Sequence, residues 1–261
     1  MINLSVYLVV QDEELRIKKT MDALVKVADE IVVVDSGSTD KTESIVREYT
    51  DKFYYNKFIS IGHQVKVAEE LCSNKWVLRL DADEELSDEL IKEILDIKEN
   101  PDCDGYFLRI GEVFPGYSKP NRWVKHYKLI RLYNREKMAM SGKHGHDDVD
   151  FICKSPKTRV LKNFVNHYSF ISIAKTIEKY NIESGRLAER AIMQGKHYSP
   201  LRMFGCMTGN MMKYFILGRY FLFGWWGFIH SLNLGVLRFL KFAKYYEAEQ
   251  AQKLNNRNIL Q

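Results

Sequence analysis

The chain has 261 residues, a hydrophobic fraction of 46% and a formal net charge of +5. This length accommodates one sizeable catalytic domain plus an appendage, and the composition is ordinary for a folded protein. The four cysteines lack metal-type spacing and no secretory leader precedes the first apolar run, so we expect reduced thiols in a cytoplasmic compartment rather than a disulfide-rich secreted protein.

Strands alternate with helices along the first eighty residues. Apolar, β-rich runs predict strands at 4–10, 31–35, 53–55 and 76–80, and helical patterns lie between them. The runs are continuous rather than alternating, which is typical of strands that are covered on both faces of a mainly parallel sheet. The sequence therefore predicts an α/β fold in which ligands bind beyond the carboxyl ends of the strands.

Acidic residues gather at that end of the predicted sheet. Asp12 and Glu13 follow the first strand, Asp35 ends the second, and Asp81 and Asp83 follow the fourth. If the chain stays extended there, Asp81 and Asp83 point to the same side. Paired carboxylates at the end of a buried strand are costly unless a cation compensates them, and Mg²⁺ binds one or two carboxylates together with substrate phosphates. The pattern predicts a metal–diphosphate site, with a solvated turn as the alternative.

Two sequence blocks at this spacing resemble family 2 glycosyltransferases. They are Asp-Ser-Gly-Ser-Thr-Asp at 35–40 and Leu-Asp-Ala-Asp-Glu at 80–84. The resemblance extends along nearly the whole chain and is nearest to the lipopolysaccharide core β-1,4-glucosyltransferase branch, although Asp12 stands where the family usually has asparagine. It implies the GT-A nucleotide-diphospho-sugar transferase fold with a mainly parallel, Rossmann-like sheet. It also implies a Mg²⁺ or Mn²⁺ ion at Asp81 and Asp83 and a UDP-sugar donor, UDP-glucose first.

The same resemblance suggests further binding residues. Glu13 and Asp35 fall where the family contacts the nucleoside of the donor. Lys66 replaces the asparagine of a Gly-x-Gln-x-Asn pattern, where it approaches the diphosphate or is a solvated surface residue. Arg131 falls on an Arg-Leu pair shared with the branch, where it binds the diphosphate or an anionic acceptor group, or braces the catalytic base.

The resemblance also indicates a catalytic base. Family 2 enzymes mostly invert the anomeric centre in one displacement, which requires a carboxylate to accept the proton of the attacking hydroxyl. The step His146-Asp147 resembles a His-Glu step of the branch, so Asp147 is the expected base and Asp148 its backup. His146 is a further candidate for the metal. A loop with surface histidines and acids is the alternative for so short a pattern.

The final third of the chain differs in character. Between residues 191 and 246 there is no Asp or Glu, whereas seven lysines and arginines are interleaved with aromatic residues. Such a stretch suits an anionic membrane surface. Arg219, His230 and Asn233 interrupt the apolar run, so we do not expect a transmembrane helix. A hairpin packed on the catalytic domain is the alternative, and the many apolar aromatic residues argue against nucleic acid as a partner.

These observations predict a GT-A catalytic domain at 1–168 and a helical, membrane-associated region at 169–261. Within the first, residues up to about 100 bind the donor, and 101–168 supply the acceptor side and the base. We expect an inverting, metal-dependent hexosyltransferase that forms a β-linkage on a lipid-linked glycan such as lipopolysaccharide core. We expect it at the cytoplasmic face of the bacterial inner membrane, as a peripheral or monotopic protein, and an oligomer is compatible with the sequence.

Three alternatives remain open at this stage. The first is a transferase for O-antigen, capsule or another surface polysaccharide that uses a different UDP-sugar. The second is a sugar-phosphate nucleotidylyltransferase, which would need a glycine-rich basic loop where this chain has Gln-Asp-Glu-Glu at 11–14. The third is an inactive nucleotide-sugar-binding module, against which the acids at 81, 83 and 147 argue.

Overall fold

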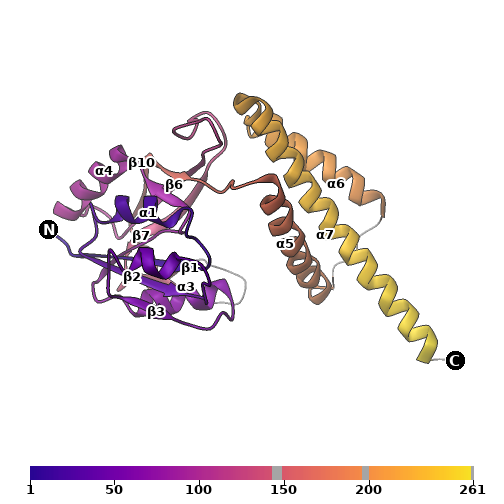
Figure 1. The fold of residues 1–261 in the computed structure, drawn as a ribbon, viewed down its shortest axis with the longest axis horizontal. Helices are drawn as coiled ribbons and strands as arrows, with labels where there is room; N and C mark the ends of the chain where they lie inside the picture. The colour runs from indigo at the N-terminus through magenta and orange to yellow at the C-terminus, as the bar shows by residue number, and fades with distance from the viewer. Residues whose placement is uncertain (143–148, 196–199, 260–261) are drawn as a thin grey trace. The chain divides into compact units, whose positions relative to one another are not determined.

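The computed structural model describes residues 1–142, 149–195 and 200–259. The chain forms two compact units (Figure 1). Unit 1 comprises Met1–Val113, Ser118–Pro120 and His126–Ser169, and unit 2 comprises Phe114–Tyr117, Asn121–Lys125 and Phe170–Gln261. Two short segments of the loop at 114–125 therefore belong with the C-terminal helices rather than with the sheet.

Unit 1 is built on a sheet of eight strands, in the order β3-β2-β1-β4-β7-β6-β10-β5 over the described residues. Its strands are β1 Leu4–Val10, β2 Glu30–Asp35, β3 Phe53–Tyr55, β4 Trp76–Arg79, β5 Glu84–Leu86, β6 Gly105–Glu112, β7 Tyr127–Asn134 and β10 Thr158–His167. A separate small sheet pairs β8 (Met138–Met140) with β9 (Val149–Phe151). The helices of this unit are α1 Ile17–Leu24, α2 Thr42–Val46, α3 Ile61–Glu70 and α4 Asp88–Glu99.

The four strands that the sequence predicts form a parallel sheet, and the remaining strands of the sheet are mixed in direction. Strands β3, β2, β1 and β4 run parallel to one another. After β4 the direction changes, because β7 is antiparallel to both β4 and β6. Strand β10 is parallel to β6, and β5 is antiparallel to β10. The expected α/β architecture is confirmed, and its second half brings the ends of β5, β6 and β10 together.

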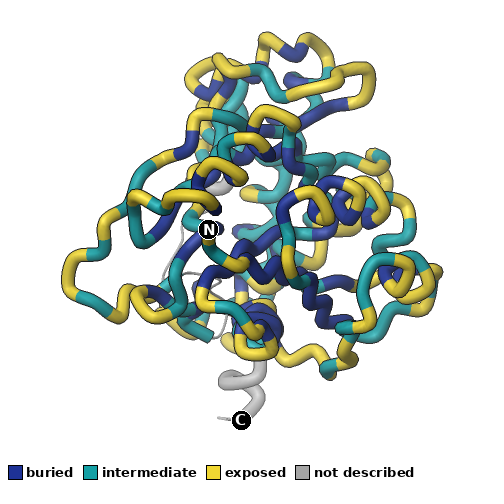
Figure 2. Tube along the Cα trace, turned by 90° about the vertical axis from the view of Figure 1, so that its left-hand side faces the viewer, coloured by how far each residue is buried: buried dark blue, intermediate teal, exposed yellow. Residues whose placement is uncertain are grey.

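The core of unit 1 lies on both faces of the sheet, which is why its central strands are continuously apolar. Val6 and Leu8 of β1 belong to a buried cluster that also holds the apolar residues of α1 and α4. Tyr7, which points to the other face, belongs to a second cluster with Val65 and other residues of α3. Figure 2 shows the buried stretches of the chain in dark blue. Successive side chains of one strand therefore pack against helices on opposite faces of the sheet.

Unit 2 consists mainly of helices. They are α5 Ile173–Met193, α6 Pro200–Met212, a π-helical turn η1 at Lys213–Leu217, a 3₁₀ turn η2 at Tyr220–Phe223, and α7 Gly224–Ile259. Helix α7 packs against both α5 and α6. Tyr220 and Phe223 are buried in an aromatic cluster with Phe114. Among the described residues, no helix combines the length and the apolar character needed to cross a membrane.

Candidate active site

The chain after β4 forms a tight turn instead of continuing as a strand. The Glu84 backbone N–H donates to the Asp81 carbonyl at 3.0 Å, and the Asp81 N–H donates to the Glu84 carboxylate, also at 3.0 Å. The buried Thr20 hydroxyl holds the middle of the turn through the Ala82 carbonyl at 2.8 Å. The expectation that residues 81–83 are extended is therefore wrong. Glu84 closes a turn in which Asp81 and Asp83 contact different partners.

Asp81 is held by two arginines. Its two carboxylate oxygens accept hydrogen bonds from Arg79 Nη2 at 3.1 Å and from Arg131 Nη2 at 2.8 Å. Partial burial raises the pKa of Asp81, but the two guanidinium groups outweigh it and hold that pKa well below its usual range. Because 42% of the Asp81 side chain remains exposed, a ligand can still reach this ionised carboxylate.

Arg131 reaches Asp81 because of a β-bulge. Tyr106 pairs with Leu132 and Phe107 pairs with Ile130, so Arg131 is an extra residue on β7 without a cross-strand partner on β6. Bulges of this kind redirect a side chain and are common beside active sites. Among the roles that the sequence left open for Arg131, the structure places its guanidinium against Asp81 and 3.4 Å from Glu84.

Asp83 faces a histidine and an arginine. Its Oδ2 atom lies 3.3 Å from His167 Nε2 and accepts a hydrogen bond from Arg16 Nη1 at 3.2 Å. The other ring nitrogen of His167, Nδ1, lies 2.9 Å from Glu112 Oε1. Burial lowers the pKa of His167, but Glu112 and Asp83 outweigh it, so that the pKa stands well above its ordinary value.

The order of the strands in the sheet brings Asp83, His167 and Glu112 together. His167 ends β10 and lies opposite Glu84 of β5 on one side and Glu112 of β6 on the other. The sequence analysis did not identify His167, Glu112 or Arg16. One local signal pointed to His167, which ends an apolar strand. Its contacts with Asp83 and Glu112, however, depend on pairing between strands that are far apart in the sequence.

Asp83 and His167 fit a divalent cation. A carboxylate oxygen and an imidazole nitrogen are suitable ligands for such an ion, and a second nitrogen bonded to a carboxylate is the usual support of a metal-binding histidine. Among the described residues, no three His, Cys, Asp or Glu side chains are grouped so that they could hold an ion by themselves. An ion bound together with substrate phosphates needs only one or two protein ligands. Asp81, which two arginines already neutralise, fits this role less well.

The acids expected near the nucleoside organise the loops at the ends of β1 and β2. Asp35 is buried and accepts hydrogen bonds from the backbone N–H groups of Gly37 and Ser38, both at 2.9 Å. Glu13 accepts three hydrogen bonds from Arg16, at 2.5, 2.7 and 2.8 Å. Because Arg16 also contacts Asp83, it links the loop after β1 to the turn after β4.

Lys66 is paired within its own helix. Its Nζ lies 3.0 Å from Oε2 of Glu69, a buried carboxylate that also accepts hydrogen bonds from the Tyr133 hydroxyl at 2.7 Å and the Met140 N–H at 3.0 Å. The structure therefore uses the charge of Lys66 to compensate Glu69. The remaining expected site residues, His146, Asp147 and Asp148, lie outside the described residues.

Comparisons with known proteins identify relatives along the whole chain. The family model described as glycosyl transferase family 2 matches residues 5–153. An uncharacterised glycosyltransferase of Rickettsia typhi is 33% identical over 98% of this chain and 90% of its own length. The lipopolysaccharide core biosynthesis glycosyltransferase LpsC of Rhizobium meliloti is 28% identical over 94% of this chain and 92% of its own. Among solved structures, S. aureus TarS residues 1–349 gives a TM-score of 0.47 at 17% identity, covering 97% of this chain and 92% of that one.

Proposed function

The chain belongs to glycosyltransferase family 2, and on that premise we propose that it transfers glucose from UDP-glucose to a lipid-linked glycan such as lipopolysaccharide core. The observation that carries this proposal is the pairing of Asp83 with His167 at the carboxyl ends of the strands, where α/β sheets bind their ligands. The name of the LpsC relative supports an acceptor of the lipopolysaccharide core class.

Asp83 and His167 would hold a Mg²⁺ or Mn²⁺ ion, which when bound neutralises charge on the leaving diphosphate. The protein residues around it have separate tasks. Glu112 accepts the Nδ1 proton of His167 and so fixes the ring with Nε2 toward Asp83. Arg79 and Arg131 keep Asp81 ionised and oriented, so that its carboxylate accepts a hydrogen bond from a hydroxyl of the donor.

We propose that Asp147 is the general base, with Asp148 as the backup. It would take the proton of the acceptor hydroxyl while that oxygen attacks the anomeric carbon and UDP leaves from the opposite face. One such displacement inverts the anomeric centre, so the product of an α-linked donor is β-linked. The support for this assignment is the His-Asp step in the sequence.

A UDP-release assay tests the function. We expect release from UDP-glucose in the presence of Mn²⁺ and a lipopolysaccharide core acceptor, and little release after chelation with EDTA. A panel of UDP-sugars establishes the donor. Equal turnover with and without the chelator would contradict the metal proposal, and no turnover with any UDP-sugar would contradict the donor class.

We further propose that unit 1 carries catalysis and that unit 2 binds the cytoplasmic face of an anionic membrane. Five large apolar side chains around the turns η1 and η2 are exposed: Ile216, Leu217, Phe221, Leu222 and Trp225. Ring contacts connect Phe221 to Phe215, Phe215 to Phe228, and Phe228 to Trp225, so the aromatic part of this surface is continuous. We call this set, from Ile216 to Trp225, the aromatic patch.

Basic residues accompany the aromatic patch. Lys213 begins η1, Arg219 immediately precedes η2, and both are exposed. Rings that insert among lipid headgroups, together with lysine and arginine, are the usual means by which peripheral proteins bind anionic lipid. Continuous exposed apolar surfaces of this kind mark contacts with lipid or protein.

Vesicle flotation tests the membrane proposal. We expect the full-length chain to float with vesicles that contain anionic lipid and to be released as salt rises, because salt screens the basic residues. Trp225→Ala should reduce flotation, whereas Trp123→Ala should not, although Trp123 is also exposed, at 62%. A wild-type chain that stays unbound on anionic vesicles at low salt would overturn the proposal.

A further inference from the structure

One carboxylate oxygen of Asp83 contacts two nitrogen atoms from different parts of the chain. Its Oδ2 atom lies 3.3 Å from His167 Nε2 and 3.2 Å from Arg16 Nη1. The first separation is compatible with both atoms binding one divalent ion, since each ligand bond to such an ion is about 2.1 Å long. The guanidinium of Arg16 would then lie next to the ion and repel it.

Arg16 is oriented mainly by Glu13. Its Nε and Nη2 atoms donate three hydrogen bonds to the Glu13 carboxylate, at 2.5, 2.7 and 2.8 Å. The remaining nitrogen, Nη1, contacts Asp83 and donates to the Tyr168 carbonyl at 3.3 Å. Because the contacts with Glu13 are shorter and more numerous, they fix one edge of the guanidinium and leave Nη1 facing the candidate ion site.

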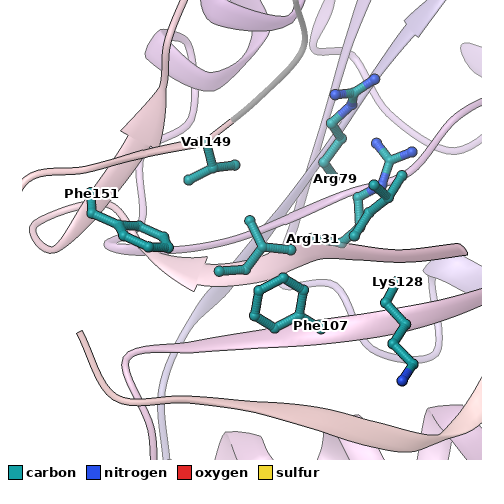
Figure 3. Close-up of a pocket in the computed structure, with 8 residues that line it drawn as sticks. Arg79, Phe107, Lys128, Arg131, Val149 and Phe151 are labelled. Atoms are coloured by element: carbon teal, nitrogen blue, oxygen red, sulfur yellow. The ribbon is translucent and has the colours of Figure 1, made fainter. Parts of the chain in front are cut away.

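The two arginines beside Asp81 differ from Arg16 in burial and in place. Arg79 and Arg131 extend from strands β4 and β7, and only 5% and 3% of their surfaces are exposed. Figure 3 shows their guanidinium groups near each other, at a cavity of about 310 Å³ that both residues line. Arg16 immediately precedes α1, and 19% of its side chain is exposed. Of these three arginines, Arg16 is therefore the one that can most readily turn toward a ligand.

Arg16 connects the loop after β1 with the turn after β4. Glu13 belongs to the loop that is expected to contact the donor nucleoside, and Asp83 belongs to the turn that carries the candidate ion site. An arginine fork binds phosphate oxygens through charged hydrogen bonds. The diphosphate of a bound donor would therefore attract Nη1 away from Asp83 and also supply negative charge for the ion.

We propose that Arg16 competes with the divalent ion for Asp83, so that the ion binds together with the donor diphosphate rather than before it. The inference rests on the proposed transferase function and adds the residue that sets the order of binding. Without the diphosphate, the guanidinium lowers the affinity for the ion because like charges repel. With the diphosphate bound, Arg16 contacts a phosphate oxygen and no longer opposes the ion.

Electron paramagnetic resonance of free Mn²⁺ with the full chain measures this competition in the absence of UDP. We expect Arg16→Gln to bind Mn²⁺ about tenfold more tightly than the wild type, because a positive charge beside the ion is removed. Arg16→Ala should give the same result, whereas Arg16→Lys keeps the charge and should stay close to the wild type. Lys19→Gln is the matched control and should leave the affinity unchanged, because Lys19 is an exposed lysine of α1 whose Nζ lies 5.0 Å from the centre of the Tyr168 ring.

The same titrations with saturating UDP test the role of the diphosphate. UDP should tighten Mn²⁺ binding to the wild type about tenfold more than it tightens binding to Arg16→Gln, because the variant has no opposition for the diphosphate to relieve. Circular dichroism of each variant should match that of the wild type.

The outcomes separate the role of Arg16 from the proposed function. If Arg16→Gln and Arg16→Ala bind Mn²⁺ no more tightly than the wild type without UDP, Arg16 supports Asp83 and the inference is overturned. An equal effect of UDP on the wild type and on Arg16→Gln would also overturn it. A wild type that binds no Mn²⁺ even with UDP would contradict the proposed metal dependence, and the comparison with Arg16→Gln would still decide the role of Arg16.

Discussion

Unit 1 and unit 2 differ in where they place apolar and charged side chains. In unit 1 the valines, leucines and isoleucines of β2 and β4 are almost completely buried, and Arg79 and Arg131 of the site are buried with a carboxylate partner. In unit 2, Leu217 and Trp225 are each 79% exposed. Exposed apolar surface of this extent is typical of a contact with a partner or a lipid, whereas a buried ion pair holds its charged groups in one arrangement.

The turn η2 shows the contrast within four residues. Tyr220 and Phe223 are buried against Phe114, whereas Phe221 and Leu222 between them are exposed. Tyr220 and Phe223 form part of the buried aromatic cluster of unit 2, whereas Phe221 and Leu222 do not belong to it. The difference implies that variants of the charged residues at the candidate site of unit 1 should alter catalysis, and that variants of the outward rings of unit 2 should alter the proposed membrane binding.

The largest expected effect comes from Asp83→Ala. Loss of this carboxylate removes a protein ligand of the proposed ion, so turnover should fall by about 10³-fold, the scale of losing an electrostatic stabiliser. Calorimetry should show that UDP no longer binds in a Mn²⁺-dependent manner, while circular dichroism remains that of the wild type. Asp88→Ala is the control, because the Asp88 side chain is 84% exposed and lies outside the site. Full activity of Asp83→Ala would exclude Asp83 as a metal ligand.

The next effect separates the two sides of turn η2. Phe223→Ala should destabilise the protein by about 3–5 kcal/mol, because it leaves a cavity in a packed aromatic cluster. Phe221→Ala should change the unfolding free energy by less than about 1 kcal/mol but reduce flotation with anionic vesicles. Urea unfolding and flotation on the same pair of variants check this. Equal loss of stability would mean that Phe221 is part of the core and that the contrast is wrong.

The first half of unit 1 could be predicted from the sequence because its signals are local. The continuous, β-branched apolar run at Ile31–Val34 predicts a strand covered on both faces, and the acids that follow such runs mark one edge of the sheet. Asp35 and Asp83 were identified as candidates in this way, and the parallel order of β1 to β4 follows from the same pattern.

The rest of the site depends on long-range pairing. His167 meets Asp83 only because β10 lies between β6 and β5, an arrangement that no local pattern encodes. Arg131 reaches Asp81 through a bulge, which shifts the register of β7 by one residue and cannot be read from its alternation. Lys66 matched a binding pattern, but the buried carboxylate that it neutralises, Glu69, lies on the same helix. Tertiary structure therefore decides which charged residues remain available for a ligand.

A smaller effect on the site is expected from Glu112→Gln. The glutamine can still accept the His167 N–H but lacks the charge that supports the ring, so the affinity for Mn²⁺ in the presence of UDP should fall by about 10–100-fold. Electron paramagnetic resonance of free Mn²⁺ measures this directly. Asp102→Asn, a change at an exposed acid in the loop before β6, should leave the affinity unchanged. An unchanged affinity in Glu112→Gln would show that His167 does not bind the ion.

The smallest effect concerns a charge of unit 1 far from any proposed ligand. Glu30 accepts hydrogen bonds from Lys52 and Ser5 and from the backbone N–H of Ser73 at 2.8 Å. Burial raises the pKa of Glu30, but Lys52 and these hydrogen bonds outweigh it and lower the pKa from 4.5 to about 2. A carboxyl whose pKa is lower in the folded than in the unfolded state adds stability above pH 4.5, and this contribution is lost as the pH falls toward 2.

Glu30→Gln should therefore reduce the unfolding free energy by about 1–2 kcal/mol at pH 7 and by nearly nothing near pH 2. Urea unfolding of both proteins across this pH range measures the difference, and Glu43→Gln, at a largely exposed ion pair, should differ from wild type by less than about 0.5 kcal/mol throughout. A difference for Glu30→Gln that stays constant with pH would mean that packing, and not charge, accounts for the stability that Glu30 contributes.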